Sequence, residues 1–145
     1  MHRVRPDDPE LLDFLRVADL TLPVESPRIH LWVERDESGQ IVGSTGYETV
    51  DDPTHALIRS VAVHPSARGQ GNGLRLATFA LDAARAAGSR HAWLFSRRSG
   101  PFWQRLGFAP ADRAEMAELL ASAQQVSLFR ESGQLEREMA WARDL

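Results

Sequence analysis

The feature that most constrains the fold is a glycine-rich segment, residues 68–73 (Arg-Gly-Gln-Gly-Asn-Gly). The residues before it, 56–64, are rich in Ile and Val and stop at Pro65, which is typical of a buried strand. The residues after it, 74–87, repeat apolar side chains at helical spacing up to Gly88. A strand that passes through glycines into a helix leaves free N–H groups at the helix N-terminus. The segment therefore predicts an anion site that can hold a diphosphate.

The spacing of these glycines argues against one common diphosphate site. A dinucleotide-binding fingerprint needs G-x-G-x-x-G and an acidic residue about 20 positions further on. Here the glycines are at positions 69, 71 and 73, and residues 91–96 contain no acid. A nicotinamide dinucleotide is disfavoured, and a flexible turn before a helix is the alternative to an anion site.

The rest of the chain alternates between strand and helix patterns. A helix is expected to begin at Pro9, capped by Asp7 or Asp8. Strands are predicted over residues 2–6, 30–35, 40–50, 56–64, 91–96 and 134–142, and further helices over 74–87, 100–106 and 112–123. Strands and helices in this order indicate an α/β or α+β sheet with helices on both faces. We expect a single domain over residues 1–145.

Two absences narrow the chemistry, because the chain has no Cys and all 17 of its Lys and Arg positions are Arg. Without Cys there is no thiolate nucleophile, no disulfide and no zinc site built on sulfur. Without Lys there is no Schiff-base lysine and no Walker A loop. No apolar run approaches the ~20 residues of a membrane span, and no apolar stretch resembles a signal peptide. We expect a cytoplasmic protein with no metal and no membrane partner.

Charge is divided unevenly along the chain. Residues 53–111 contain eight Arg and one acid, a balance of +7, whereas the whole chain carries −3. The middle of the chain therefore suits a polyanionic ligand, with solvated helix faces as the alternative. Nucleic acid is not expected, because no run interleaves basic and aromatic residues.

Three segments together resemble the Gcn5-related N-acetyltransferase (GNAT) superfamily. Residues 68–73 resemble its Gln/Arg-x-x-Gly-x-Gly/Ala motif, and residues 60–65 (Ser-Val-Ala-Val-His-Pro) resemble the strand before it. Residues 102–108 (Phe-Trp-Gln-Arg-Leu-Gly-Phe) resemble the family's Phe-Tyr-x-x-x-Gly-Phe segment. A narrower likeness to the small arsenic-resistance (ArsN-type) acetyltransferases rests on residues 46–48, 57–63, 101–103 and 122–128. The resemblance implies a GNAT-like mixed, mostly antiparallel sheet of about six to seven strands with helices on both faces.

By this resemblance the co-substrate is acetyl-CoA. Backbone groups of the strand would hold its pantetheine, and the amides of the glycine-rich segment would hold its pyrophosphate. The expected binding residues are Val61, Ala62, Val63, Arg68, Gly69, Gln70, Gly71, Asn72, Gly73 and Leu74. The phosphates of CoA would also account for the +7 balance of the central segment.

Acetyl transfer to an amine requires a group that removes a proton. Glu48, near the end of a hairpin strand, is the first choice, and the alternative is an exposed strand-end acid. Glu34, Asp51 and Asp52 are less favoured. His64 has a suitable ordinary pKa but precedes Pro65, so we expect it to support the loop.

The family's usual general acid is missing. Its Tyr is replaced by Trp103, whose N–H is not a useful proton donor. Ser96, Ser99, a water or simple release of the thiolate would then serve. Tyr47, the single Tyr, is a candidate substitute, and a core aromatic is its alternative role.

Arg59 lies inside an otherwise apolar strand, and Arg can hold a carboxylate with two parallel hydrogen bonds. We expect it to anchor an acidic group of an amino-acid-like substrate, and the alternative is a pair with Asp51 or Glu48. The expected substrate-binding residues are Arg59, Ser60, Tyr47 and Trp103.

The sequence thus predicts an acetyl-CoA-dependent N-acetyltransferase. Its expected acceptor is the primary amine of a small molecule, amino-acid-like or cationic, which attacks directly in a ternary complex. The alternatives are a non-catalytic module that binds CoA and an N-acetyltransferase of proteins or peptides. A homodimer is left open.

Overall fold

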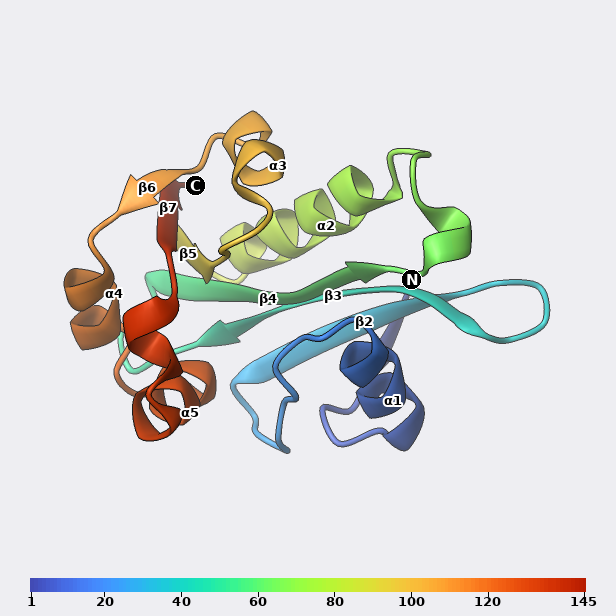
Figure 1. Cartoon of the computed structure of the whole chain (residues 1–145), viewed down its shortest axis with the longest axis horizontal. Coiled ribbons are helices and arrows are strands. Elements are labelled where there is room, and N and C mark those ends of the chain that lie inside the picture. The colour runs from blue at the N-terminus through green and yellow to red at the C-terminus, as the bar shows by residue number, and fades with distance from the viewer.

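A central sheet of seven strands organises the computed structural model, which describes residues 1–145 (Figure 1). The strands are β1 (His2–Val4), β2 (Ile29–Arg35), β3 (Ile41–Thr49), β4 (His55–Val63), β5 (His91–Phe95), β6 (Ala109–Ala111) and β7 (Ala140–Asp144). The helices are α1 (Pro9–Val17), α2 (Asn72–Ala86), α3 (Gly100–Arg105), α4 (Arg113–Leu119) and α5 (Gln124–Ser132), with 3₁₀ turns η1 (Pro65–Ala67) and η2 (Gln134–Arg137). The strand order is β1-β2-β3-β4-β5-β7-β6.

One pair of neighbouring strands, β4 and β5, is parallel, and all the others are antiparallel. The parallel pairing begins at His55 with His91 and ends at Leu57 with Trp93. Beyond that point β4 continues to Val63 without a partner on this side, while β5 stays paired with β7 on its other edge along its whole length. The sheet therefore opens between the carboxyl ends of β4 and β5, as Figure 1 shows.

A bulge in β4 lies next to this opening. Ser60 and Val61 of β4 together oppose Thr45 of β3, because the register shifts between Gly46↔Arg59 and Ser44↔Ala62. Ser60 has a φ of 62°, in the left-handed region that non-glycine residues seldom adopt. The Ser44 hydroxyl donates to the Ser60 carbonyl at 2.6 Å and holds the bulge in place. A bulge bends its strand, so the bend at Ser60 adds to the separation of β4 from β5 beyond the point where their pairing stops.

Helices cover both faces of the sheet. Helices α2 and α3 pack on one face, where Ile58 of β4 contacts an apolar cluster that includes Leu81 and Trp103. The neighbouring Leu57 points to the other face and joins a cluster with residues of α4 and α5. Helix α1 closes the same face over β2 and β3. None of the helices combines the length and apolarity that crossing a membrane requires.

This architecture confirms the predicted mixed, mostly antiparallel sheet with helices on both faces. Helix α1 begins at Pro9 as expected, and the Asp8 side chain accepts hydrogen bonds from the amides of Glu10 and Leu11. Helix α2 begins at Asn72, two residues before its predicted start.

The C-terminal predictions were less accurate. The predicted strand over residues 134–142 is wrong at its start, because 134–137 form η2 and the strand is β7. The strand was predicted from the alternation of Leu135, Arg137, Met139 and Trp141, but these residues do not share a face, since Met139 is 48% exposed while Trp141 is 5% exposed. The predicted helix over 112–123 is the shorter α4, and α5 and β6 were not predicted. Helix α5 escapes detection because its N-cap residue is Ala123, which gives no capping signal.

Two glycines of β3 test how closely the sheet is packed. A Cβ at Gly46 would collide with the His30 carbonyl and the Leu31 side chain, whereas a Cβ at Gly43 would meet only the end of the Leu76 side chain, at 2.9 Å. We expect Gly46→Ala to lower the unfolding free energy by about 3 kcal/mol and Gly43→Ala by about 1 kcal/mol, the two ends of the cost of overpacking. Urea denaturation of both variants measures the difference. Equal losses would contradict the close backbone approach at Gly46.

Candidate active site

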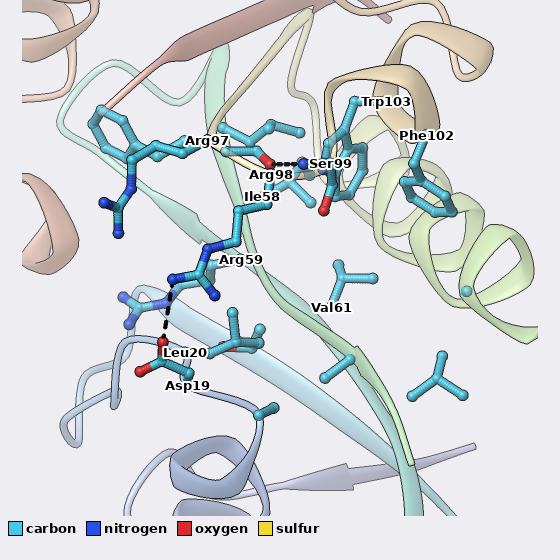
Figure 2. Close-up of a pocket in the computed structure, with 18 of the residues that line it drawn as sticks. Asp19, Leu20, Ile58, Arg59, Val61, Arg97, Arg98, Ser99, Phe102 and Trp103 are labelled. Atoms are coloured by element: carbon cyan, nitrogen blue, oxygen red, sulfur yellow. Dashed lines mark hydrogen bonds and ion pairs between the residues drawn. The ribbon is translucent and has the colours of Figure 1, made fainter. Parts of the chain in front are cut away.

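A cavity of about 690 Å³ occupies the opening between β4 and β5 (Figure 2). Its walls come from the second half of β4, the segment from β5 into α3, the glycine-rich segment, the loop after α1, α5 and η2. Segments distant in sequence therefore meet around one space, which exists because the strands stop pairing there.

The cavity collects most of the charge of the basic central segment. Five of the eight Arg between residues 53 and 111 line it, namely Arg59, Arg68, Arg97, Arg98 and Arg105. Two carboxylates line it as well, Asp19 and Glu138. The uneven charge of the sequence is therefore concentrated at a cavity, as expected of a site for an anionic ligand.

The glycine-rich segment presents the N-terminus of α2 at this cavity. Gly69 and Gly71 have φ values of 78° and 76°, and a Cβ on either would meet no atom within 4 Å. Gly71 is the N-cap residue, so no side chain occupies the first amides of the helix. Asn72 pins the segment from the other side, because its Nδ2 donates to the Ala67 carbonyl at 2.9 Å. These open amides and the positive end of the helix dipole suit a phosphate group.

Most of the residues expected to bind acetyl-CoA lie at this cavity. Those that line it are Val61, Ala62, Val63, Arg68, Gly69, Gly71, Asn72, Gly73 and Leu74. Gln70 does not line it and is exposed. The backbone edge of residues 61–63 that faces β5 has no strand partner, so it can pair with an extended ligand.

The residues expected to act in catalysis and substrate binding divide into two groups. Arg59, Ser60, Ser96 and Trp103 line the cavity, whereas Glu48 and Tyr47 do not. Tyr47 is 5% exposed and stacks against His30 and Trp32 of β2, and its burial raises its pKa above the ordinary value. Tyr47 is therefore a core aromatic residue, which was the alternative role expected from the sequence.

Two further expectations concern Ser96 and His64. The Ser96 hydroxyl oxygen accepts a hydrogen bond from the Ser99 amide at 3.1 Å, which brings both hydroxyl groups to the start of α3. The His64 Nδ1 accepts from the Ser66 amide at 3.1 Å. His64 therefore supports the loop before the glycine-rich segment, as expected.

Glu48 and Arg59 form a buried ion pair across β3 and β4. The side chains are 2% and 0% exposed, and Arg59 Nη1 lies 2.8 Å from Glu48 Oε1. The same Nη1 donates to Gln124 Oε1 at 2.7 Å. Of the alternatives that the sequence left open for Arg59, the pairing with Glu48 is the one observed. The alternative that Glu48 is an exposed acid at the end of its strand is wrong.

The Glu48 carboxylate also caps α5. It accepts hydrogen bonds from the backbone amides of Gln124 and Gln125, the first two residues of the helix. Both of its oxygens are therefore engaged inside the protein. A general base must reach the proton that it removes, and this carboxylate faces the helix rather than the cavity. The geometry thus gives Glu48 a structural position.

Arg59 keeps unused hydrogen-bonding capacity. Burial lowers the pKa of Arg59 below its usual value, and the adjacent Glu48 carboxylate opposes that shift. Its Nε and Nη2 are buried without a hydrogen-bond partner, and so are Ser60 Oγ and Gln125 Oε1. All three residues line the cavity.

One cavity residue was missed by sequence reasoning. The side chain of Glu138 is 6% exposed, and its Oε2 lies 3.3 Å from Arg97 Nε and accepts from Gln134 Nε2 at 2.7 Å. The sequence did not single out Glu138, because it lies within the predicted strand over 134–142, among other charged residues. No local signal separates Glu138 from its exposed neighbour Glu136, because its burial depends on how the C-terminal segment packs. No three His, Asp or Glu side chains gather closely enough to hold a metal ion.

Comparison by sequence identifies one family. The family model described as Acetyltransferase (GNAT) family matches residues 3–108. No curated protein matches the chain significantly. The narrower likeness to the ArsN-type enzymes stays a prediction.

Several solved structures share the fold. N-acetylglutamate synthase from Neisseria gonorrhoeae, complexed with coenzyme A and N-acetyl-glutamate, superposes with a TM-score of 0.73 at 20% identity. The match covers 99% of this chain and 34% of that enzyme, so the chain spans about a third of its length. Rv2747 from Mycobacterium tuberculosis, in complex with CoA, has a TM-score of 0.71 at 18% identity, with 100% and 99% of the two chains covered. A GNAT-family acetyltransferase from Staphylococcus aureus Mu50 has a TM-score of 0.70 at 12% identity, with 99% and 98% covered.

If Glu48 has a structural role, replacing it should lower the unfolding free energy. We expect Glu48→Gln to lower the unfolding free energy by about 3–5 kcal/mol, because it leaves the buried Arg59 charge unpaired. The matched control is Glu34→Gln, which breaks the more exposed pair with Arg75 and should cost about 1 kcal/mol or less. Urea denaturation compares the two. If Glu48→Gln is as stable as the control, the pair does not hold the structure together.

Proposed function

Because the chain belongs to the acetyltransferase (GNAT) family, we propose that it transfers the acetyl group of acetyl-CoA to the primary amine of a small molecule. The observation that carries this proposal is the single cavity that joins the open N-terminus of α2 to the unpaired edge of β4. A phosphate-binding end and an extended backbone edge in one space match the two halves of CoA.

The chain's own groups fit this co-substrate. The amides of residues 69–74 receive the pyrophosphate, with Arg68 and Arg105 as nearby cations. The free edge of residues 61–63 pairs with the amides of pantetheine, as another strand would. The N. gonorrhoeae and M. tuberculosis proteins of the same fold were solved with CoA, which supports this assignment.

The other side of the cavity suits a small acceptor. In Figure 2, Arg97, Arg98 and Asp19 gather on one side, and Val61 and Phe102 lie on the other. The loop after α1 is joined to α5 by the hydrogen bond from Gln125 Nε2 to Thr21 Oγ1, at 3.1 Å. It also meets the segment before α3 through Arg98 and Asp19, whose charged atoms are 3.7 Å apart. This cover favours a small molecule over a protein chain.

A proton must leave the amine before or during transfer. Of the two carboxylates at the cavity, Glu138 is buried and Asp19 is exposed at the rim. Glu138 Oε2 is engaged by Arg97 and Gln134, while Oε1 makes no hydrogen bond. We assign proton removal to Glu138 Oε1, directly or through a water, in place of Glu48.

The remaining chemistry needs few groups. Ser96 and Ser99 stand at the rim near Trp103, where their hydroxyls can donate to the departing CoA thiolate. With no Cys in the chain, no acetyl-cysteine can form, and the amine attacks the thioester directly.

The glycine-rich segment supplies the first test. We expect Gly71→Val to weaken acetyl-CoA binding at least tenfold, because a β-branched side chain disfavours a φ of 76° and would obstruct the open amides. The matched control is Gly39→Val, where φ is 88° and a Cβ also meets no atom within 4 Å, but the position is outside the cavity. Calorimetry measures both affinities, and unaltered binding in Gly71→Val would overturn the assignment.

The second test concerns proton removal. We expect Glu138→Gln to lower kcat/KM by ~10²–10⁴ while acetyl-CoA affinity stays unchanged. The exposed neighbour is the control, because Glu136→Gln should change kcat/KM less than threefold. Thiol release is followed over a panel of amino acids, polyamines and aminoglycosides. If the wild type binds acetyl-CoA but releases no thiol with any amine, the protein is a binding module rather than an enzyme.

A further inference from the structure

We propose that His30 is a pH-sensitive switch that controls whether β1 stays attached to the sheet. Strand β1 is at one edge of the sheet, three strands away from β4 and its cavity. His30 does not line that cavity, so the inference goes beyond the proposed function and does not rest on it.

Few contacts hold β1 in place. It pairs with β2 through only three residues, from His2 opposite Val33 to Val4 opposite Leu31. His2 and Arg3 are exposed, and only Val4 is partly buried, against the apolar cluster beneath α1. A strand with so little burial belongs to the least stable parts of a fold, so the loss of one further contact can release it.

The side chain of Arg3 supplies that further contact. Its guanidinium lies over the Trp32 ring, with Cζ 5.3 Å from the ring centroid, and its Nη2 is hydrogen-bonded to Nδ1 of His30. Arg has N–H donors and no acceptor, so Nδ1 of His30 must accept and carry no proton. This contact between β1 and β2 therefore requires the neutral form of His30.

A proton added to His30 would break this hydrogen bond and place a second cation against Arg3. The His30 ring is half-buried and stacks on Tyr47, with ring centroids 4.9 Å apart, so water has limited access to screen the two charges. Burial, and then the neighbouring Arg3 charge, lower the pKa of His30 below its usual value. The attached strand and the charged imidazole therefore oppose each other.

The other charged groups on the elements around His30 are engaged with one another. They form two sets, Glu34 with Arg75 of α2, and Arg5 with Asp7 and Glu25. The N-terminal ammonium also acts on Glu34, and Tyr47 of β3 stays neutral because burial raises its pKa. No carboxylate forms an ion pair with His30, so a positive charge on its ring is not compensated.

The direction of the pH effect follows from the lowered pKa. When β1 is detached, His30 returns to its ordinary value of about 6.5, so the detached state binds a proton more readily than the attached state. The contribution of His30 to attachment is therefore complete above about pH 7 and is lost as the pH falls below about 6.5. Release would uncover the backbone edge of β2 that β1 covers at neutral pH.

Amide hydrogen exchange, followed by NMR on the full chain, tests the switch without acetyl-CoA or an acceptor. Each exchange rate is divided by the intrinsic rate at the same pH, and the amides between β3 and β4 serve as the internal reference. We expect the protection of the β1 amides to fall roughly threefold or more between about pH 7.5 and 5.5, within the limit of about tenfold per pH unit for uptake of one proton. Protection that stays constant over this range would overturn the proposal.

Matched variants assign the effect to His30. His30→Asn keeps an acceptor for Arg3 but does not titrate, so the fall in protection should shrink to less than about twofold. Arg3→Gln keeps a donor without the charge, and the fall should be smaller than in the wild type. His2→Asn removes an exposed histidine of the same strand and should leave the fall unchanged.

The variants also show which results contradict the assignment. A wild-type fall in folded His30→Asn would refute the role of His30. If His30→Asn does not fold, Arg3→Gln decides, because Arg3 is exposed and its replacement should be tolerated. An undiminished fall in Arg3→Gln would then contradict the proposal. Because none of these measurements involves acetyl transfer, their failure leaves the proposed function standing, and a protein without activity can still show the switch.

Discussion

The buried carboxylate of Glu48 is the contact on which the candidate site depends. It joins β3, on which it lies, to Arg59 of β4 and to the first amides of α5. One side chain thereby fixes the direction of the Arg59 guanidinium and places one wall of the cavity. A buried charge is tolerated only when it is paired and hydrogen-bonded, and Glu48 meets both conditions. The sequence suggested that Glu48 is a reactive acid, whereas in the structure it holds Arg59 and the start of α5 in place.

The cavity itself follows from how the sheet is interrupted. Strands β4 and β5 share three paired positions and then separate, and the bulge at Ser60 bends β4 at the same place. Free backbone is normally a hazard at the edge of a sheet, but here it faces a cavity that other segments of the chain surround. The interruption thus yields a surface that can bind an extended ligand through its main chain.

The sequence was informative where the structural signal is local. The glycine-rich segment, the Asp8 cap and the apolar strand before Pro65 each depend on neighbouring residues, and they predicted α1, β4 and α2 closely. The Arg59 pair was foreseen as an alternative. The cap of α5 and the burial of Glu138 were not predicted, because both depend on residues brought together by the whole fold. Glu48 is 76 positions from the amide that it caps, and no periodicity reports such a contact.

The distant cap of α5 has a consequence for the order in which the protein folds. A helix of nine residues is marginal on its own, and this one has no capping side chain of its own. Its N-terminus gains a partner only after β3 and β4 have paired and Glu48 and Arg59 are in position. Closing so long a loop is slow compared with forming a hairpin. The wall that carries Gln125 should therefore assemble after the central hairpin, and the acceptor side of the cavity would be among the last parts of the molecule to form.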